Sequence, residues 1–146
     1  MSGHTLDELP EWPVGTASVL ATVDEDGAPH AIPVSTPHRA GPMRIVFALG
    51  PSRGSHTRLQ ANPRATMLIM AADTAFSAEG TVRVIAEPLD PDGRVNGLEL
   101  TVETIWDHNG PTFGMEDGVR WHWTDEDAKQ GDDAAHAALE EIAASS

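Results

Sequence analysis

Cysteine and tyrosine are both missing from this 146-residue chain. Without cysteine there can be no disulfide, no thiolate nucleophile, no cysteine-ligated zinc site and no iron–sulfur cluster. Since tyrosine is missing as well, any redox chemistry has to come from a bound cofactor. The sequence therefore favours a protein whose reactive group, if it has one, is a bound small molecule.

Basic residues are also scarce. The chain has nine of them against 23 acidic residues, and its net charge is −14. Nucleic acids and anionic membrane surfaces are bound mainly through basic side chains, so neither partner is predicted. Five of the nine cations nevertheless fall in one stretch with few acidic neighbours. They predict a local anion-binding site, with pairing to carboxylates as the alternative. They are Arg39, Arg44, Arg53, Arg58 and Arg64.

Long apolar runs are also missing. The longest strongly apolar stretch, 67–72, is far shorter than the roughly 20 residues that span a bilayer. Residues 1–13 lack the basic region and apolar run of a secretory signal. We therefore expect a cytoplasmic protein with one domain over 1–146, in which 1–13 is an N-terminal extension and 124–146 a C-terminal helical tail.

Much of the remaining sequence alternates with a period of two residues, as β-strands do. Asp26-Gly27 is a hairpin signal between a strand over 16–24 and a return strand over 29–36. Pro33 cannot donate to a sheet ladder, so it is expected at an edge or bulge. In one later strand Trp106 is expected on the same face as Leu98 and Leu100. The further strands are predicted over 43–49, 65–72, 76–87, 95–106 and 119–123, with a turn over 39–42.

Two helices are predicted. Ser55 is a suitable N-cap for a short helix over 56–61. A second, alanine-rich helix follows Thr124, which resembles a capping box with Asp127, and Gly131 is expected to interrupt it. The predicted fold is mainly β, a closed or partly closed antiparallel barrel of six or seven strands with a short helix after the third strand and a C-terminal helix.

The segment 50–63, GPSRGSHTRLQANP, is the most distinctive motif. The N-terminus of a helix presents unpaired N–H groups and the positive end of its dipole. Neighbouring arginines and hydroxyl groups would complete a phosphate site. An ordinary capped helix with surface arginines is an equally good interpretation. It is not a nucleotide-binding P-loop, because the glycine spacing is one residue short and no lysine follows the second glycine.

The order of these pieces resembles the pyridoxamine-phosphate-oxidase-like family of FMN-binding split barrels. The similar stretches are ATVDEDGAPHAIPV, RIVFALGPSRGSHTRLQANPRATMLI and FSAEGTVRVIAE, within 16–87. The resemblance implies a split barrel that forms a homodimer and holds FMN in grooves at the dimer interface. It also implies a flavin-dependent oxidoreductase that acts on a small-molecule substrate.

Two departures from the family pattern leave alternatives open. Many flavin-binding members carry a lysine where Ser55 stands, and the C-terminal substrate-phosphate signature of true vitamin B6 oxidases is not recognisable. An F420-dependent reductase, whose tail site Arg39, Arg44 and Arg64 could extend, is one alternative. A non-catalytic dimer that binds flavin or haem is the other.

The resemblance also implies site residues. The phosphate would lie on Arg53, Ser55, Thr57 and Arg58, with His56 beside them. The isoalloxazine edge would meet the backbone of Pro33, Val34, Ser35, Thr36, Ala48 and Leu49, and the partner subunit would add Trp106 and Arg120.

Other side chains suggest no catalytic acid or base. The seven histidines lack the spacing of a zinc site, so no metal centre is predicted. Trp121 and Trp123 share one face of the last predicted strand. This favours core or dimer packing over stacking on a cofactor.

Overall fold

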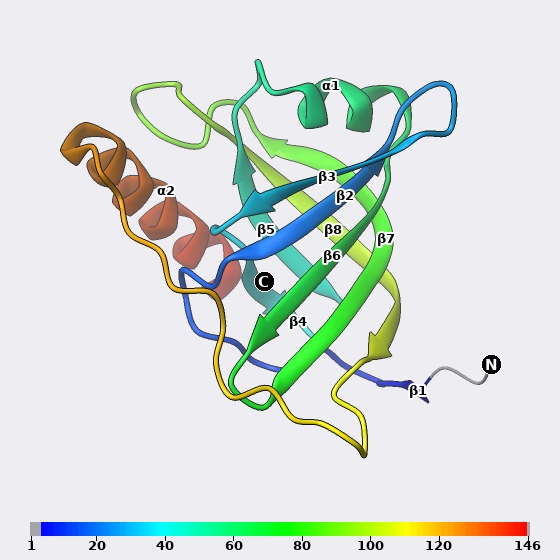
Figure 1. Cartoon of the computed structure of the whole chain (residues 1–146). Helices are drawn as coiled ribbons and strands as arrows, with labels where there is room; N and C mark the ends of the chain where they lie inside the picture. Colours follow the sequence, from blue (N-terminus) through cyan, green and yellow to red (C-terminus); the bar gives the residue numbers. More distant parts are fainter. Residues whose placement is uncertain (1–3, 146) are drawn as a thin grey trace.

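The computed structural model describes residues 4–145, so residues 1–3 of the predicted extension and residue 146 of the tail lie outside it. Within this range the chain forms one antiparallel sheet of eight strands that curls into a barrel (Figure 1). Helix α1 covers one end of the barrel and α2 lies along its side. No helix in the described range is long and apolar enough to cross a bilayer. The elements are β1 (His4–Thr5), β2 (Ser18–Val23), β3 (Pro29–Val34), β4 (His38–Gly41), β5 (Arg44–Leu49), α1 (Gly54–Ala61), β6 (Arg64–Ala71), β7 (Thr74–Ala86), β8 (Asn96–Asp107) and α2 (Glu126–Ala144).

The strand order is β3-β2-β6-β7-β8-β5-β4, with β1 on β8. Strands β3 and β4 end this order, so the barrel is open between them although they follow each other in the chain. Pro33 lies in β3 opposite Val19, which confirms its expected place on an edge strand. The Thr36 hydroxyl donates to the Ala48 carbonyl at 3.2 Å and accepts from the Ala48 N–H at 2.9 Å. This side chain ties the β3–β4 connection to β5.

The barrel interior confirms the alternating pattern. Leu20, Met67, Phe47 and Leu100 each come from a different strand and are fully buried. Leu9, from the predicted N-terminal extension, is only 2% exposed and belongs to the same cluster. Residues 4–13 therefore pack as part of the barrel.

Gly80 is the place where β7 and β8 come closest. A Cβ atom there would lie 1.9 Å from the Thr101 carbonyl oxygen, so only glycine fits. The register shifts at this point, with Glu103 as the extra residue. Because such a bulge reverses the alternation, Ile105 is buried instead of Trp106. The expectation that Trp106 shares a face with Leu98 and Leu100 is therefore wrong.

Residues 38–41 form the strand β4, where a turn over 39–42 was expected. Glycine and proline there suggest a turn, but residues 38–41 pair with β5 and contact α2. Residues 119–123, expected to be a strand, instead form an irregular segment outside the sheet. Trp121 and Trp123 are 39% and 40% exposed, so they are not core residues.

Both helix starts differ from the prediction. Helix α1 begins one residue before Ser55, with Arg53 as its N-cap, and Ser55 is buried. Helix α2 has Asp125 as its N-cap, and its carboxylate accepts from the Asp127 N–H. The helix continues through Gly131 without a break.

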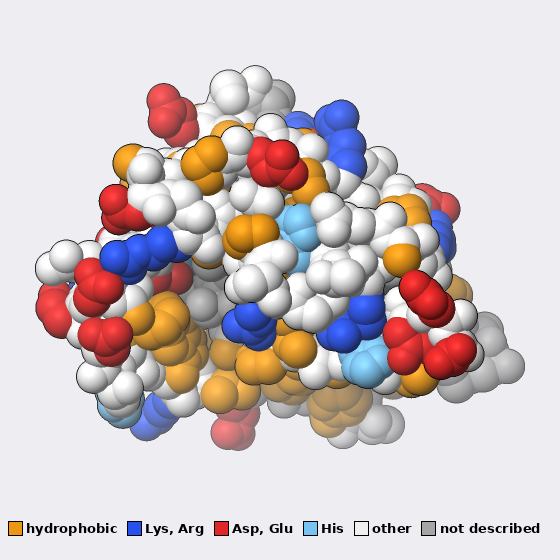
Figure 2. Space-filling view, turned by 90° about the horizontal axis from the view of Figure 1, so that it is seen from above, with side chains coloured by type: hydrophobic (Ala, Val, Ile, Leu, Met, Phe, Trp, Pro, Cys, Tyr) orange, Lys and Arg blue, Asp and Glu red, His pale blue; other side chains and the backbone are white. Residues whose placement is uncertain are grey.

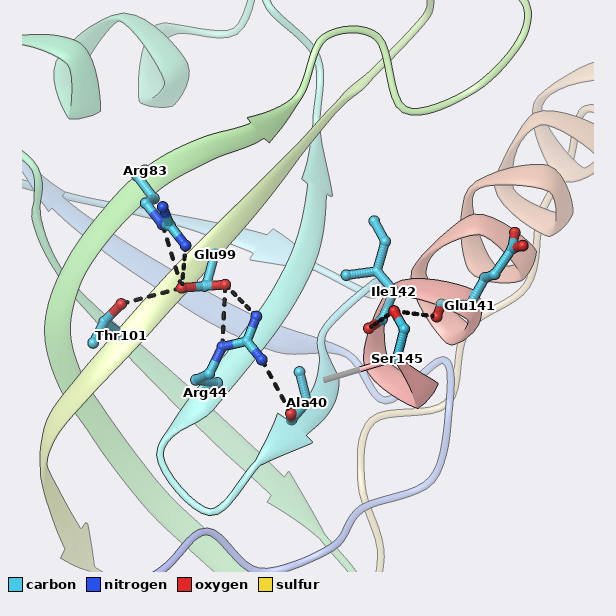
Figure 3. A network of polar contacts seen from close by, with 8 residues as sticks. All are labelled: Ala40, Arg44, Arg83, Glu99, Thr101, Glu141, Ile142 and Ser145. Atoms are coloured by element: carbon cyan, nitrogen blue, oxygen red, sulfur yellow. Dashed lines mark hydrogen bonds and ion pairs between the residues drawn. The ribbon is translucent and has the colours of Figure 1, made fainter.

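Three of the five clustered arginines are paired with carboxylates from distant parts of the chain. Arg39 lies 3.8 Å from Glu8, and Arg64 pairs with Glu103. Arg44 and Arg83 both pair with Glu99, which is 3% exposed (Figure 3). Burial alone raises the pKa of Glu99, but the hydrogen bond and charge of Arg44, followed by Arg83, hold its pKa below the usual value. The predicted anion site therefore does not include these three arginines.

The close approach at Gly80 gives a stability prediction. We expect Gly80→Ala to lower the free energy of unfolding by about 3 kcal/mol, because the Cβ atom would overlap the backbone of β8. Urea denaturation measures the change. Gly114→Ala is the matched control, since a Cβ there meets nothing within 4 Å. Equal stability of the two variants would contradict the interpretation.

Candidate functional site

A cavity of about 350 Å³ lies beside the opening of the barrel. The β3–β4 connection, the end of β5 and the following loop contribute one group of lining residues, and helix α2 contributes another. Figure 2, which looks onto the α1 end, shows hydrophobic side chains along the boundary between α2 and the barrel. The size is within the range of small-molecule sites. The lining residues are Pro33, Val34, Ser35, Thr36, Ala48, Leu49, Gly50, Arg53, Arg94, Val95, Trp123, Ala128, Gly131, Asp132 and Ala135.

The structure brings seven of the thirteen candidate residues to this cavity. They all lie in the chain segments that flank the opening of the barrel. The hydroxyl of Thr36 both donates to and accepts from the backbone of Ala48, so it is not available to a ligand. The seven are Pro33, Val34, Ser35, Thr36, Ala48, Leu49 and Arg53.

Arg53 is the one cation among these seven residues, and no carboxylate in the described range pairs with it. Within residues 4–145 its side chain has no hydrogen-bond or ion-pair partner, whereas Arg94 is held by Asp127. A Cβ at Gly50 would lie 3.4 Å from the Arg53 side chain and 3.7 Å from the Arg94 carbonyl oxygen. Over the described range α1 also begins without a side-chain cap or an acidic residue in its first turn. The side chain of Arg53 therefore places positive charge at this end of the cavity, next to the uncapped start of α1.

Four other candidate residues on α1 lie away from the cavity. Ser55 accepts from Arg58 Nη2 at 3.1 Å, and Arg58 Nε donates to Thr22 at 2.9 Å. Arg58 thereby ties α1 to β2, and it lines a separate cavity with Thr57. His56 is buried, and its Nε2 accepts from Asn96 at 3.1 Å.

The two candidates assigned to a partner subunit also lie outside the cavity of their own chain. Trp106 lies on the outside of the barrel and donates its indole N–H to Glu79. Arg120 is exposed on the irregular segment before α2. Nothing in the single chain brings them to the other site residues.

The sequence interpretation missed the contribution of α2 and the segment before it. Ala128, Gly131 and Ala135 present small side chains to the cavity. A Cβ at Gly131 would lie 2.9 Å from Arg94 Nη1, so the glycine admits this guanidinium. A glycine inside a helix costs about 1 kcal/mol relative to alanine. Its presence in the helical pattern was the available signal of a close contact.

Polar contacts hold α2 beside the cavity. Near its start, Arg94 donates to the backbone and carboxylate of Asp127 at 3.1–3.2 Å. Further along, His136 Nδ1 lies 2.8 Å from Nε2 of His38 in β4. The other ring nitrogen of His136 lies 3.4 Å from Asp132. On either side of His136, Ala135 and Leu139 pack in a small apolar cluster with β4 and β5.

Burial, followed by the charge of His136, lowers the pKa of His38, while the carboxylates of Glu140 and Asp132 partly oppose this shift. His38 is 6% exposed. The histidine pair is therefore most stable when His38 is neutral.

The fold defines the chain as a split-barrel protein with a cavity at its opening. The family model for pyridoxamine 5'-phosphate oxidase matches residues 12–109, about two thirds of the chain. The chain therefore belongs to the pyridoxamine 5'-phosphate oxidase family. No curated protein sequence matches it.

Solved structures agree with this fold. A pyridoxamine 5'-phosphate oxidase candidate from Lactobacillus delbrueckii has a TM-score of 0.59 and 18% identity, covering 72% of this chain and 98% of its own. An F420 reductase has a TM-score of 0.54 and 17% identity, covering 62% of this chain and 89% of its own. An FMN-binding protein from Nostoc punctiforme, related to pyridoxamine 5'-phosphate oxidase, has a TM-score of 0.53 and 13% identity, covering 62% of this chain and 72% of its own. These similarities show the shared fold alone.

The histidine contact predicts how stability depends on pH. The pKa of His38 is lower in the folded protein than its ordinary 6.5, so the unfolded chain binds more protons below about pH 6.5. The free energy of unfolding should therefore fall as the pH drops from about 7.5 to about 5.5. We expect a shallower fall in His38→Gln, measured by urea denaturation at several pH values.

The exposed His122 supplies the control, and His122→Gln should retain the wild-type pH dependence. Identical slopes for wild type and His38→Gln would show that the buried histidine does not titrate as described.

Proposed function

We propose that the chain binds FMN in the 350 Å³ cavity and acts as an FMN-dependent oxidoreductase of its family. The observation that carries the proposal is Arg53, which is unpaired among residues 4–145 and lines the cavity. Most of the other lining residues are uncharged, and the two charged ones, Arg94 and Asp132, already have partners. A phosphate requires a cation and N–H donors, and a flat ring requires apolar surfaces. The residues present therefore fit a phosphorylated flavin.

The backbone of the opening would orient the flavin ring. Residues 35–37 connect two edge strands. Of these, Ser35 and Thr36 line the cavity, and their peptide groups belong to no strand pairing. They can pair with the polar edge of a heteroaromatic ring, as edge-strand groups do with any complementary partner. The bound flavin would supply hydride or electron transfer, while this chain binds and orients it.

An F420-dependent reductase is the second candidate, and the arginine pairing favours FMN over it. The F420 tail would need cations beyond the first phosphate. Arg39, Arg44 and Arg64, the residues expected to extend such a groove, are each paired with a glutamate. A ligand tail would have to displace Glu8, Glu99 or Glu103 to reach them.

We also propose that the protein works in the cytoplasm as a homodimer. Trp106 and Arg120 lie outside the cavity of their own chain, so they would reach a flavin only across a subunit interface. Sedimentation analysis of the full chain with and without FMN tests the assembly. A monomer in both conditions would remove these two residues from the proposed site.

The function is tested first by the absorption spectrum of the purified protein and by titration with FMN, F420 and haem. Bound flavin with saturable FMN binding supports the proposal and justifies a search for electron donors and acceptors. A preference for F420 supports the second candidate. Haem binding without FMN binding points to a non-catalytic haem carrier and contradicts the proposal.

Arg53 gives the sharpest variant. Arg53→Ala should weaken FMN binding by about 1.5–3 kcal/mol, the usual contribution of hydrogen bonds to charged groups. Riboflavin lacks the phosphate, so its affinity should not change. Titration by flavin fluorescence measures both, and Arg64→Ala serves as an arginine control outside the cavity. The phosphate assignment is wrong if Arg53→Ala binds FMN like the wild type.

A further inference from the structure

Trp123 is a large aromatic side chain on the cavity that the sequence did not connect with a ligand. It lines the cavity together with the β3–β4 connection and α2. It is nevertheless 40% exposed. An exposed tryptophan that belongs to a concave site has apolar surface available for a ligand.

The orientation of this indole is fixed. Its Nε1–H donates to Asp132 Oδ2 at 3.2 Å. Its ring meets that of Trp121 at 5.4 Å between centroids with an interplanar angle of 83°. Trp121 is fixed in turn, because its Nε1–H donates to the Gly15 carbonyl at 2.9 Å. A perpendicular ring pair covers at most one face of Trp123, which leaves the other face available to a planar partner.

Space for such a partner exists on the same side of the cavity. Helix α2 contributes Ala128, Gly131 and Ala135 there, none of which extends far from the helix. The carboxylate of Asp132 also lines the cavity, but it is engaged with Trp123 and close to His136. All these residues follow position 109, where the family match ends. This side of the cavity is therefore built by a segment outside the matched region.

We propose that Trp123 is a ligand-binding residue whose indole ring packs against the planar heteroaromatic ring of the bound cofactor. The ring then lies between the peptide groups of the β3–β4 connection and the C-terminal segment. Asp132 acts as a positioning residue, because it holds the indole by its N–H. This inference rests on the proposed function, since it takes the flavin ring as the planar group.

The experiment compares FMN and riboflavin binding by the full-length wild type, Trp123→Leu, Trp123→Phe and Trp121→Leu. Aromatic stacking on a base contributes about 1–3 kcal/mol, so Trp123→Leu should weaken both ligands by roughly tenfold or more. Trp123→Phe should retain most of the affinity. Trp121→Leu removes a similar indole that does not line the cavity, so its effect should be clearly smaller. Near-ultraviolet circular dichroism and urea denaturation show whether each variant is folded.

Flavin emission gives a second readout. An indole in contact with a flavin quenches its emission by electron transfer, so bound flavin should be brighter in Trp123→Leu than in the wild type or Trp121→Leu. Equal affinity and equal emission in both leucine variants would overturn the inference while leaving the proposed function intact. If Trp123→Leu does not fold, Trp123→Phe decides through its emission, which should exceed that of the wild type. If Arg53→Ala loses FMN binding and Trp123→Leu does not, the phosphate site is supported and Trp123 has no role in binding. Failure of the wild type to bind either flavin would overturn both proposals.

Discussion

The close contact between β7 and β8 at Gly80 is the constraint on which the rest of the structure depends. These two long strands link the two parts of the sheet, since β6 pairs with β7 and β5 pairs with β8. The missing side chain lets the strands approach, and the bulge beside it changes their register. Bulges bend and twist a sheet. The curled sheet leaves β3 and β4 as its edges, and the cavity lies where the chain crosses between them.

Local patterns in the sequence predicted six of the eight strands and both helices. Alternation identified the inward-facing residues Ala78, Gly80 and Val82 of β7, and Asp26-Gly27 identified the first hairpin turn. In β2 the apolar alternation pointed to the wrong face, because Ser18, Leu20 and Thr22 are the buried residues. Strand β4 was missed because Gly41-Pro42 has the composition of a turn. Its strand conformation depends on pairing with β5 and on packing against α2. Both are tertiary contacts that no local pattern contains.

The candidate site also has a part that the sequence predicted and a part that it did not. The residues from β3 to α1 follow one another in the chain and could be assigned by resemblance, and seven of them meet at the cavity. Arginine pairing could not be predicted, because Glu99 and Glu103 lie far from Arg44 and Arg64 in sequence. Gly131 inside a helical pattern indicated a close contact, but the sequence could not name the partner. The glycine is explained only by the guanidinium of Arg94, which comes from the connection between β7 and β8.

The two sides of the cavity are held by different forces. The barrel side rests on a large, fully buried apolar core, whereas α2 rests on a small apolar cluster, one exposed ion pair and the histidine pair. Local opening costs least where few apolar contacts are lost, so α2 is the side that opens more readily. A ligand in the cavity would contact both sides, and its binding would then favour the docked position of α2 by mass action.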